Sequence, residues 1–240
     1  MLRRLSARTV PVLAALLCVT SSPRAAAAPV GASVPADTAG LAHGTAAGEA
    51  SAALISAAAD AGLRSDVLEM ALRARARVMA EGRTSSPIVT VIDFSLPSRE
   101  RRLWVLDVAR AEVLAHELVA HGRNTGGDIA QSFSNEVGSY QSSLGTFVTG
   151  ETYRGKHGLS LRLNGLDPAL NSHAAERAIV IHGADYVNDS IVSQQSRLGR
   201  SEGCPALSPS VAPRIIGLIS GGTVLFAYYP VPELEQTLDS

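Results

Sequence analysis

A cysteine that follows a glycine and a histidine that ends an apolar run are the residues best suited to chemistry. Cys204 follows Gly203, and His182 follows the apolar run from Ala178 to Ile181. A free thiol, with a pKa of about 8.5, is mostly protonated at neutral pH, and its nucleophilic form is the thiolate. An imidazole within reach can accept the proton. We therefore predict Cys204 as a nucleophile and His182 as its general base and acid.

Two glycines beside these residues have predicted roles of their own. Gly203 leaves room for a carbonyl substrate, and the N–H groups of Gly203 and Cys204 can stabilise negative charge on its oxygen. The imidazole also needs a partner that orients it through its second nitrogen. The sequence demands no carboxylate for this purpose, because the backbone carbonyl of Gly183 can serve.

A second histidine pattern, His116 to His121, resembles the helix of zinc proteases but has the wrong spacing. Zinc-protease histidines are four residues apart, whereas these two are five apart. On a helix the two rings would point about 140° apart, and on a strand they would lie on opposite faces. We predict no metal site here.

Residues 1–28 have the layout of a secretory signal peptide, with arginines at positions 3, 4 and 8, an apolar stretch and an alanine-rich exit. The stretch is shorter than the roughly 18 residues that span a bilayer and contains Pro11, so we expect no stable membrane span after cleavage between Ala26 and Ala28. The prediction is export to the periplasm, cell envelope or medium. Cleavage would remove Cys18 and leave Cys204 as a buried, crosslinking or nucleophilic thiol.

The composition indicates one main globular core and argues against nucleic acid as the main partner. Hydrophobic residues make up 46% of the chain, so a sizeable core can form. Aromatic residues make up only 4%, and the net charge is -1. Nucleic-acid binding normally needs basic patches and aromatic stacking platforms, and neither is indicated.

The N-terminal part divides by composition into a linker and a helical segment. Residues 29–48 contain almost no large apolar side chain and predict a flexible linker. Residues 49–82 have apolar residues at helical spacing and predict two helices, broken at Gly62 and ended by Gly82. The arginines of the second helix (Arg73, Arg75 and Arg77) are expected on a solvated face.

Residues 86–230 have the residue pattern of a mainly β domain, and residues 231–240 are expected to form a C-terminal tail. The predicted strands are the β-branched runs 88–94, 159–163, 179–181 and 223–229. Residues 103–119 fit either a helix or a hairpin, and we favour strands. Residues 131–158 are polar and Gly-rich and are expected to form loops that shape a cleft.

These residues resemble the murein L,D-transpeptidase catalytic domain family, YkuD-like cysteine transpeptidases, whose signature is a strand-end His-Gly followed by Ser-x-Gly-Cys. Here these are His182-Gly183 and Ser201-Glu202-Gly203-Cys204. Supporting motifs are Ile92-Asp93-Phe94, Val119 to Gly122, Phe133 to Asn135, Ser142 to Gly145, Gly155 to Gly158, Gly165 to Asp167 and Gly199 to Ser201. The resemblance implies a mainly β fold of the L,D-transpeptidase type, a β-sandwich or barrel preceded by a short α-helical segment.

The resemblance also implies acyl transfer on peptidoglycan stem peptides, without metal or organic cofactor. Cys204 would attack the carbonyl before a terminal D-alanine and form a thioester, with His182 moving the protons. An amine acceptor would give a crosslink, and water would give L,D-carboxypeptidase activity. Two competing hypotheses are a catalytically silent peptidoglycan-binding module and a secreted cysteine protease, and the oligomeric state stays open.

The substrate-binding residues implied by the resemblance are Ser201, Arg200, His121, Ser143, Gly145, Tyr153 and His157. The chain departs from the family pattern at two places. Glu202 stands where related enzymes often have histidine, and Pro205-Ala206 replaces a common Arg or Asn. The nucleophile and base are retained, so these departures affect the expected substrate contacts.

Overall fold

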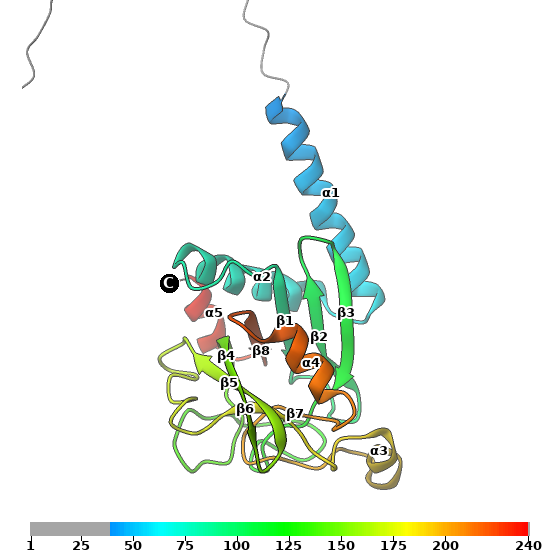
Figure 1. Cartoon of the computed structure of the whole chain (residues 1–240), viewed down its shortest axis with the longest axis vertical. Coiled ribbons are helices and arrows are strands. Elements are labelled where there is room, and N and C mark those ends of the chain that lie inside the picture. Colours follow the sequence, from blue (N-terminus) through cyan, green and yellow to red (C-terminus); the bar gives the residue numbers. More distant parts are fainter. Residues whose placement is uncertain (1–38, 240) are drawn as a thin grey trace, which may run out of the picture. The chain divides into compact units, whose positions relative to one another are not determined.

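One eight-stranded sheet organises residues 39–239, the part of the chain that this computed structural model describes (Figure 1). The strands are β1 (Ile88–Asp93), β2 (Arg101–Asp107), β3 (Glu112–Leu118), β4 (Gly145–Gly155), β5 (Gly158–Gly165), β6 (Val180–Gly183), β7 (Ala206–Leu207) and β8 (Val224–Tyr228). Their order across the sheet is β3-β2-β1-β8-β4-β5-β6-β7. The mainly β fold class is therefore confirmed.

The sheet curls until its two edges meet. Strands β3 and β7 are the outermost strands in the sheet order, yet Ala120, just beyond β3, bridges Ala206 of β7. The Ala120 N–H donates to the Ala206 carbonyl at 2.9 Å. A neighbouring bridge joins Gly122 to Ser201. This pairing covers part of both edges, as in a barrel.

Helices cover both faces of the sheet. On one face lie α1 (Ala39–Asp60), α2 (Ser65–Ala80) and α5 (Pro232–Asp239), and the other face receives α4 (Ala212–Ile219) (Figure 1). Strand β1 alternates between them, because Val91 packs with α2 whereas Ile92 packs with the isoleucines of α4. The α2 segment thus shares its core with the sheet instead of forming a separate unit.

Arg77 anchors α2 by an ion pair with a buried carboxylate, so the prediction of a solvated arginine face is wrong for this residue. Its Nη2 lies 2.5 Å from Oδ1 of Asp167, whose side chain is fully buried. Its Nη1 donates to the carbonyl of Thr237 in α5 at 2.8 Å. Arg75 also turns inward and donates to the Ser86 carbonyl. Helical spacing could not reveal the Asp167 and Thr237 partners of Arg77, because they lie 90 and 160 residues further along the chain.

Several expected elements are present. The two N-terminal helices are separated at Gly62, which has φ 79°, and α2 ends before Gly82, which has φ 68°. Both values lie in the left-handed region that glycine favours at helix ends. Residues 103–119 form the favoured hairpin of β2 and β3, with Ala111 at φ 56° in its turn.

Other expectations need correction. The expected loop region 131–158 contains β4, whose C-terminal half is exposed and therefore lacks an apolar pattern. The expected tail 231–240 contains α5, which contributes the buried Leu234 to the core. The expected linker 29–48 overlaps α1, which begins at Ala39.

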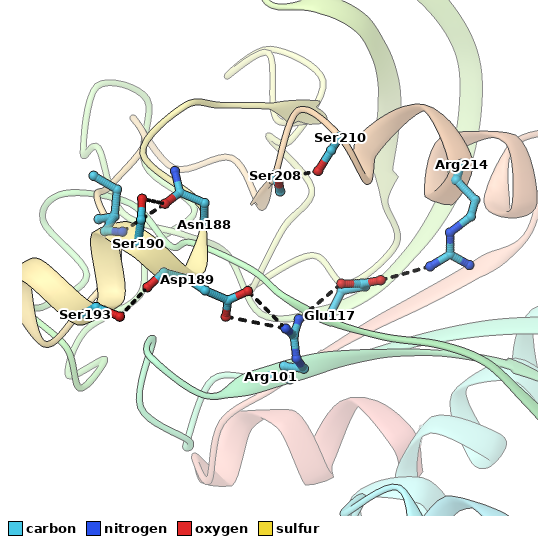
Figure 2. Close-up of polar contacts among 10 residues, drawn as sticks. Arg101, Glu117, Asn188, Asp189, Ser190, Ser193, Ser208, Ser210 and Arg214 are labelled. Carbon is cyan, nitrogen blue, oxygen red and sulfur yellow. Dashed lines mark hydrogen bonds and ion pairs between the residues drawn. The ribbon is translucent and has the colours of Figure 1, made fainter.

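A charged network joins α3 (Asp189–Gln195) and α4 to the β2–β3 hairpin, and Figure 2 shows its side chains converging. Arg101 lies 3.3 Å from Glu117 and 3.3 Å from Asp189. Arg214 of α4 reaches the other oxygen of Glu117 at 2.9 Å. The network helps to fix α3, which follows the end of β6.

None of the helices within residues 39–239 combines the length and the apolar character needed to cross a bilayer. The predicted signal peptide, residues 1–28, lies outside the described residues.

Candidate active site

The end of β6 and the turn before β7 bring His182 and Cys204 into one pocket. Strands β6 and β7 are parallel, and His182 pairs with Ala206, two residues after Cys204. Both side chains line a pocket of about 470 Å³. The pairing of a short parallel strand with β6 therefore positions the thiol beside the histidine-bearing strand.

The His182 ring is oriented by its own backbone neighbour. Its Nδ1 lies 2.9 Å from the carbonyl oxygen of Gly183, which can only accept a hydrogen bond, so Nδ1 carries the proton. Burial lowers the pKa of His182 below its usual 6.5, and the charges of His157 and Lys156 lower it further, against the opposing effect of the Gly183 hydrogen bond. The ring is thus neutral at pH 7, with the Nε2 lone pair available as a base.

The Cys204 thiol is partly buried and points to a backbone carbonyl. Its Sγ donates to the carbonyl of Ala178 at 3.7 Å, and within the described residues no hydrogen bond joins it to His182. Burial raises the pKa of Cys204, and nearby Glu202 raises it further. A backbone hydrogen bond at Val180 and the charge of Arg177 act in the opposite direction. The resting thiol is therefore protonated.

The turn that carries Cys204 is held by Ser201. Its hydroxyl donates to the Cys204 carbonyl at 2.6 Å and accepts the Gly203 N–H at 3.0 Å. The Gly203 N–H, which the sequence suggested as an oxyanion donor, is therefore engaged within the turn. Only the Cys204 N–H stays a predicted donor. Gly203 itself has φ 124°, a conformation that other residues rarely adopt.

Four of the seven predicted substrate-binding residues line the pocket with Cys204 and His182: Tyr153, His157, Arg200 and Ser201. Tyr153 and His157 come from the β4–β5 hairpin, and His157 stacks on the ring of His182. Arg200 donates to the carbonyls of Arg123 and Gly126, both at 3.0 Å, and so ties two loops at the rim together.

His121 is buried and does not line the pocket. Its ring is fully buried, donates from Nε2 to the Gly127 carbonyl, and accepts from Arg102 through Nδ1 at 2.8 Å. Burial lowers the pKa of His121 to about 4, and the charge of Arg102 lowers it too. Its backbone carbonyl accepts the Ser201 N–H at 3.0 Å. His121 therefore supports, through its backbone, the turn Ser201 to Cys204, hereafter the nucleophile turn.

Ser143 and Gly145 also lie away from the pocket wall. Ser143 is buried and donates to the Ser134 carbonyl at 3.0 Å. Gly145 begins β4, and a Cβ there would lie within 2.4 Å of the Asp167 carboxylate. Its φ of 95° also favours glycine. Both residues shape the scaffold behind the site.

Sequence reasoning missed several charged and aromatic residues that line the pocket: Arg123, Lys156, Arg177 and Tyr186. Lys156 belongs to a motif of the resemblance, but the motif assigns it no role. A basic residue just before an apolar strand was the available signal for Arg177. Among residues 39–239, no three His, Cys, Asp or Glu side chains are grouped as a metal would require.

The curled sheet and its shared pocket define a mainly β domain with a cysteine–histidine site. Its sequence matches the L,D-transpeptidase catalytic domain over residues 59–228, more than half of the chain. The chain therefore belongs to the L,D-transpeptidase family. The match begins within the helical segment, in agreement with the core that α2 shares with the sheet.

Solved structures show weaker likenesses. An L,D-transpeptidase from Mycobacterium smegmatis is 15% identical with a TM-score of 0.38, and the match covers 60% of this chain and 59% of that one. One from Stackebrandtia nassauensis is 14% identical with a TM-score of 0.37, and the match covers 62% of this chain and 59% of that one. The chain thus spans less than two thirds of either solved chain. No curated protein matches it.

Proposed function

We propose that this protein is an exported cysteine acyltransferase that acts on peptidoglycan stem peptides, with Cys204 as nucleophile and His182 as general base and acid. The observation that carries the proposal is the shared pocket, in which Nδ1 of His182 is bound to the Gly183 carbonyl. That contact leaves Nε2 as the atom that can take a proton from the thiol. Membership of the L,D-transpeptidase family supports the same chemistry.

The first half-reaction is acylation of Cys204. The thiol turns from the Ala178 carbonyl, gives its proton to Nε2 of His182, and attacks the carbonyl carbon before the terminal D-alanine. A C–S bond forms, the C–N bond breaks, and His182 passes the proton to the departing D-alanine amine. The product is a thioester. The Cys204 N–H is the proposed donor to the oxyanion of the intermediate.

The second half-reaction releases the acyl group. His182 removes a proton from an incoming amine, which attacks the thioester carbon, and the C–S bond breaks. His182 then returns that proton to the Cys204 sulfur, so the enzyme is regenerated. An amine on a second stem peptide produces a crosslink. Water in the same position produces a trimmed tripeptide.

The test is incubation of the purified chain with a disaccharide-tetrapeptide that carries diaminopimelate, followed by mass spectrometry. We expect a crosslinked dimer and free D-alanine with the parent protein, and neither with Cys204→Ala. Tripeptide without dimer would identify an L,D-carboxypeptidase. If Cys204→Ala gives the same products as the parent, the thiol mechanism is refuted. An unchanged tetrapeptide in every reaction would favour a silent binding module. Cleavage of an ordinary all-L peptide would favour a protease.

Export belongs to the same proposal and rests on residues 1–28. Their basic start, apolar stretch and alanine-rich end are typical of a secretory leader. N-terminal sequencing of the protein recovered from the cell envelope or medium should begin after Ala26, Ala27 or Ala28. Recovery of the chain with Met1 intact, in the cytoplasm alone, would contradict export.

A further inference from the structure

Arg177 places a guanidinium between the nucleophile turn and the loop at residues 134–143. It lies just before β6 and lines the same pocket as Cys204. Nη1 donates to the Ser134 carbonyl at 2.5 Å and to the Ser143 hydroxyl at 2.6 Å. Nη2 donates to the Gln141 carbonyl at 2.5 Å and to the Ser139 hydroxyl at 3.0 Å. All four terminal N–H groups are therefore engaged.

The loop that Arg177 holds presses directly on the nucleophile turn. A Cβ at Gly203 would lie 2.8 Å from the Gln141 carbonyl oxygen and 3.3 Å from Nη2 of Arg177. The adjacent Ser142 hydroxyl donates to the Gly203 carbonyl at 3.0 Å. Movement of this loop would therefore change the backbone immediately before Cys204.

The same guanidinium brings a positive charge close to the thiol. Arg177 and Cys204 interact electrostatically, and the charge of Arg177 lowers the pKa of the thiol against the larger, opposing effect of burial. Because its terminal N–H groups are bonded to the loop, Arg177 acts on the sulfur through space. An arginine suits this arrangement, since its planar fork can hold several acceptors and stay charged.

Other titratable groups also face Cys204. The β4–β5 hairpin contributes Tyr153, Lys156 and His157, and β6 with the residues after it contributes His182 and Tyr186. The loops at the rim contribute Arg123, Arg200 and Glu202. Of these, Lys156 lowers the pKa of Cys204 and Glu202 raises it. The exposed Glu202 also pairs with Arg123 at 3.6 Å.

We propose that Arg177 is a positioning residue that clamps the 134–143 loop against the Gly203–Cys204 turn and supplies a fixed positive charge for the Cys204 thiolate. The protonated thiol donates to the Ala178 carbonyl, and that carbonyl would repel the thiolate once the proton leaves. The neighbouring Arg177 charge opposes this repulsion. The proposal rests on the proposed function for its importance, because only a nucleophilic Cys204 needs a stabilised thiolate.

The experiment measures ionisation of the thiol and needs no peptidoglycan substrate. Carbamidomethylation of Cys204 by iodoacetamide is followed over a pH range that brackets the midpoint of the parent and of each variant. Mass spectrometry of the peptide that contains Cys204 excludes interference from Cys18. The variants are Arg177→Gln, which removes the charge, and Arg177→Lys, which keeps it. Arg214→Gln is the matched control. Arg214 pairs with Glu117 (Figure 2), and neither residue lines the pocket.

We expect Arg177→Gln to move the alkylation midpoint to higher pH and to slow alkylation at pH 7 about tenfold. Arg177→Lys should stay within about threefold of the parent rate at pH 7, and Arg214→Gln should match the parent. Near-ultraviolet circular dichroism checks that each variant is folded.

An unchanged midpoint in folded Arg177→Gln would overturn the proposal. So would a midpoint in Arg177→Lys that rises as far as in Arg177→Gln, since the charge would then be irrelevant. If Arg177→Gln does not fold, Arg177→Lys decides alone: a rate within threefold supports the proposal and a tenfold loss refutes it. A parent that alkylates as expected but forms no muropeptide product would refute the proposed function and leave this inference standing.

Discussion

The imidazole of His157 lies against that of His182, with ring centroids 4.4 Å apart and planes inclined by 29°. His157 comes from the turn between β4 and β5, whereas His182 ends β6. The contact helps to leave His182 only 3% exposed, although it lines the pocket. The ring of His157, an exposed residue on a hairpin turn, therefore covers part of the proposed base.

The pH dependence of acylation should reflect this burial. Because the pKa of His182 lies below its usual 6.5, its neutral form persists below that pH and is lost only as the pH falls further. We expect the rate of D-alanine release to fall on the acid side with a half-maximal value below pH 6.5. A half-maximal rate above pH 7 would contradict this assignment of the base.

Removal of the His157 ring should raise the pH at which the reaction rate falls to half on the acid side. His157→Ala exposes His182 to water and removes a nearby charge, and both changes raise the pKa of His182. We expect the acid limb of the pH–rate profile to move to higher pH. His157→Phe retains the stack and should move it less. His173→Ala, on a surface histidine hydrogen-bonded to Asn135, is the control. Equal profiles for His157→Ala and parent would refute the shielding role.

Gly203→Ala should inactivate the enzyme without unfolding it. A Cβ at this position would meet the Gln141 carbonyl at 2.8 Å, and φ is 124°. The turn must shift, and a displacement of the nucleophile by about 1 Å can reduce the rate about a hundredfold. Gly217→Ala in α4 has open space around the new methyl group and should stabilise the fold by about 0.5–1 kcal/mol. Urea unfolding and D-alanine release measure the two effects, and full activity of Gly203→Ala would show that the turn tolerates a side chain.

Arg77→Met should destabilise the whole domain. It leaves the fully buried Asp167 carboxylate without its positive partner, and such a loss typically costs about 3–5 kcal/mol. The exposed pair of Arg83 and Glu81 provides the control, because Arg83→Met should change the free energy of unfolding by less than about 1 kcal/mol. Equal urea midpoints for the two variants would mean that Arg77 contributes no more than a surface arginine.

Most of the features that could be predicted from the sequence depend on short-range patterns. The β2–β3 hairpin, the helix break at Gly62 and the pairing of His182 with a Gly183 carbonyl depend on neighbours in the chain. Strand β4 was missed because its exposed half contains polar residues and glycines where an apolar alternation would mark a strand.

Long-range contacts account for the residues that were misplaced or overlooked. His121 was expected in the substrate cleft, but burial beside Arg102 is a property of the folded sheet and not of its sequence neighbours. Arg177 escapes prediction because its four acceptors lie more than 30 residues earlier in the chain. Charge and residue type identify such groups as candidates, and only tertiary structure selects among them.

The bridge between Ala120 and Ala206 couples the position of the thiol to the meeting of the two sheet edges. Ala206 is two residues from Cys204, and its partner Ala120 lies just beyond the hairpin at the opposite edge. A nascent polypeptide that ends before residue 206 holds all of the first hairpin and still lacks this join. In such a chain the cysteine would lack the pocket that it shares with His182 in the folded domain.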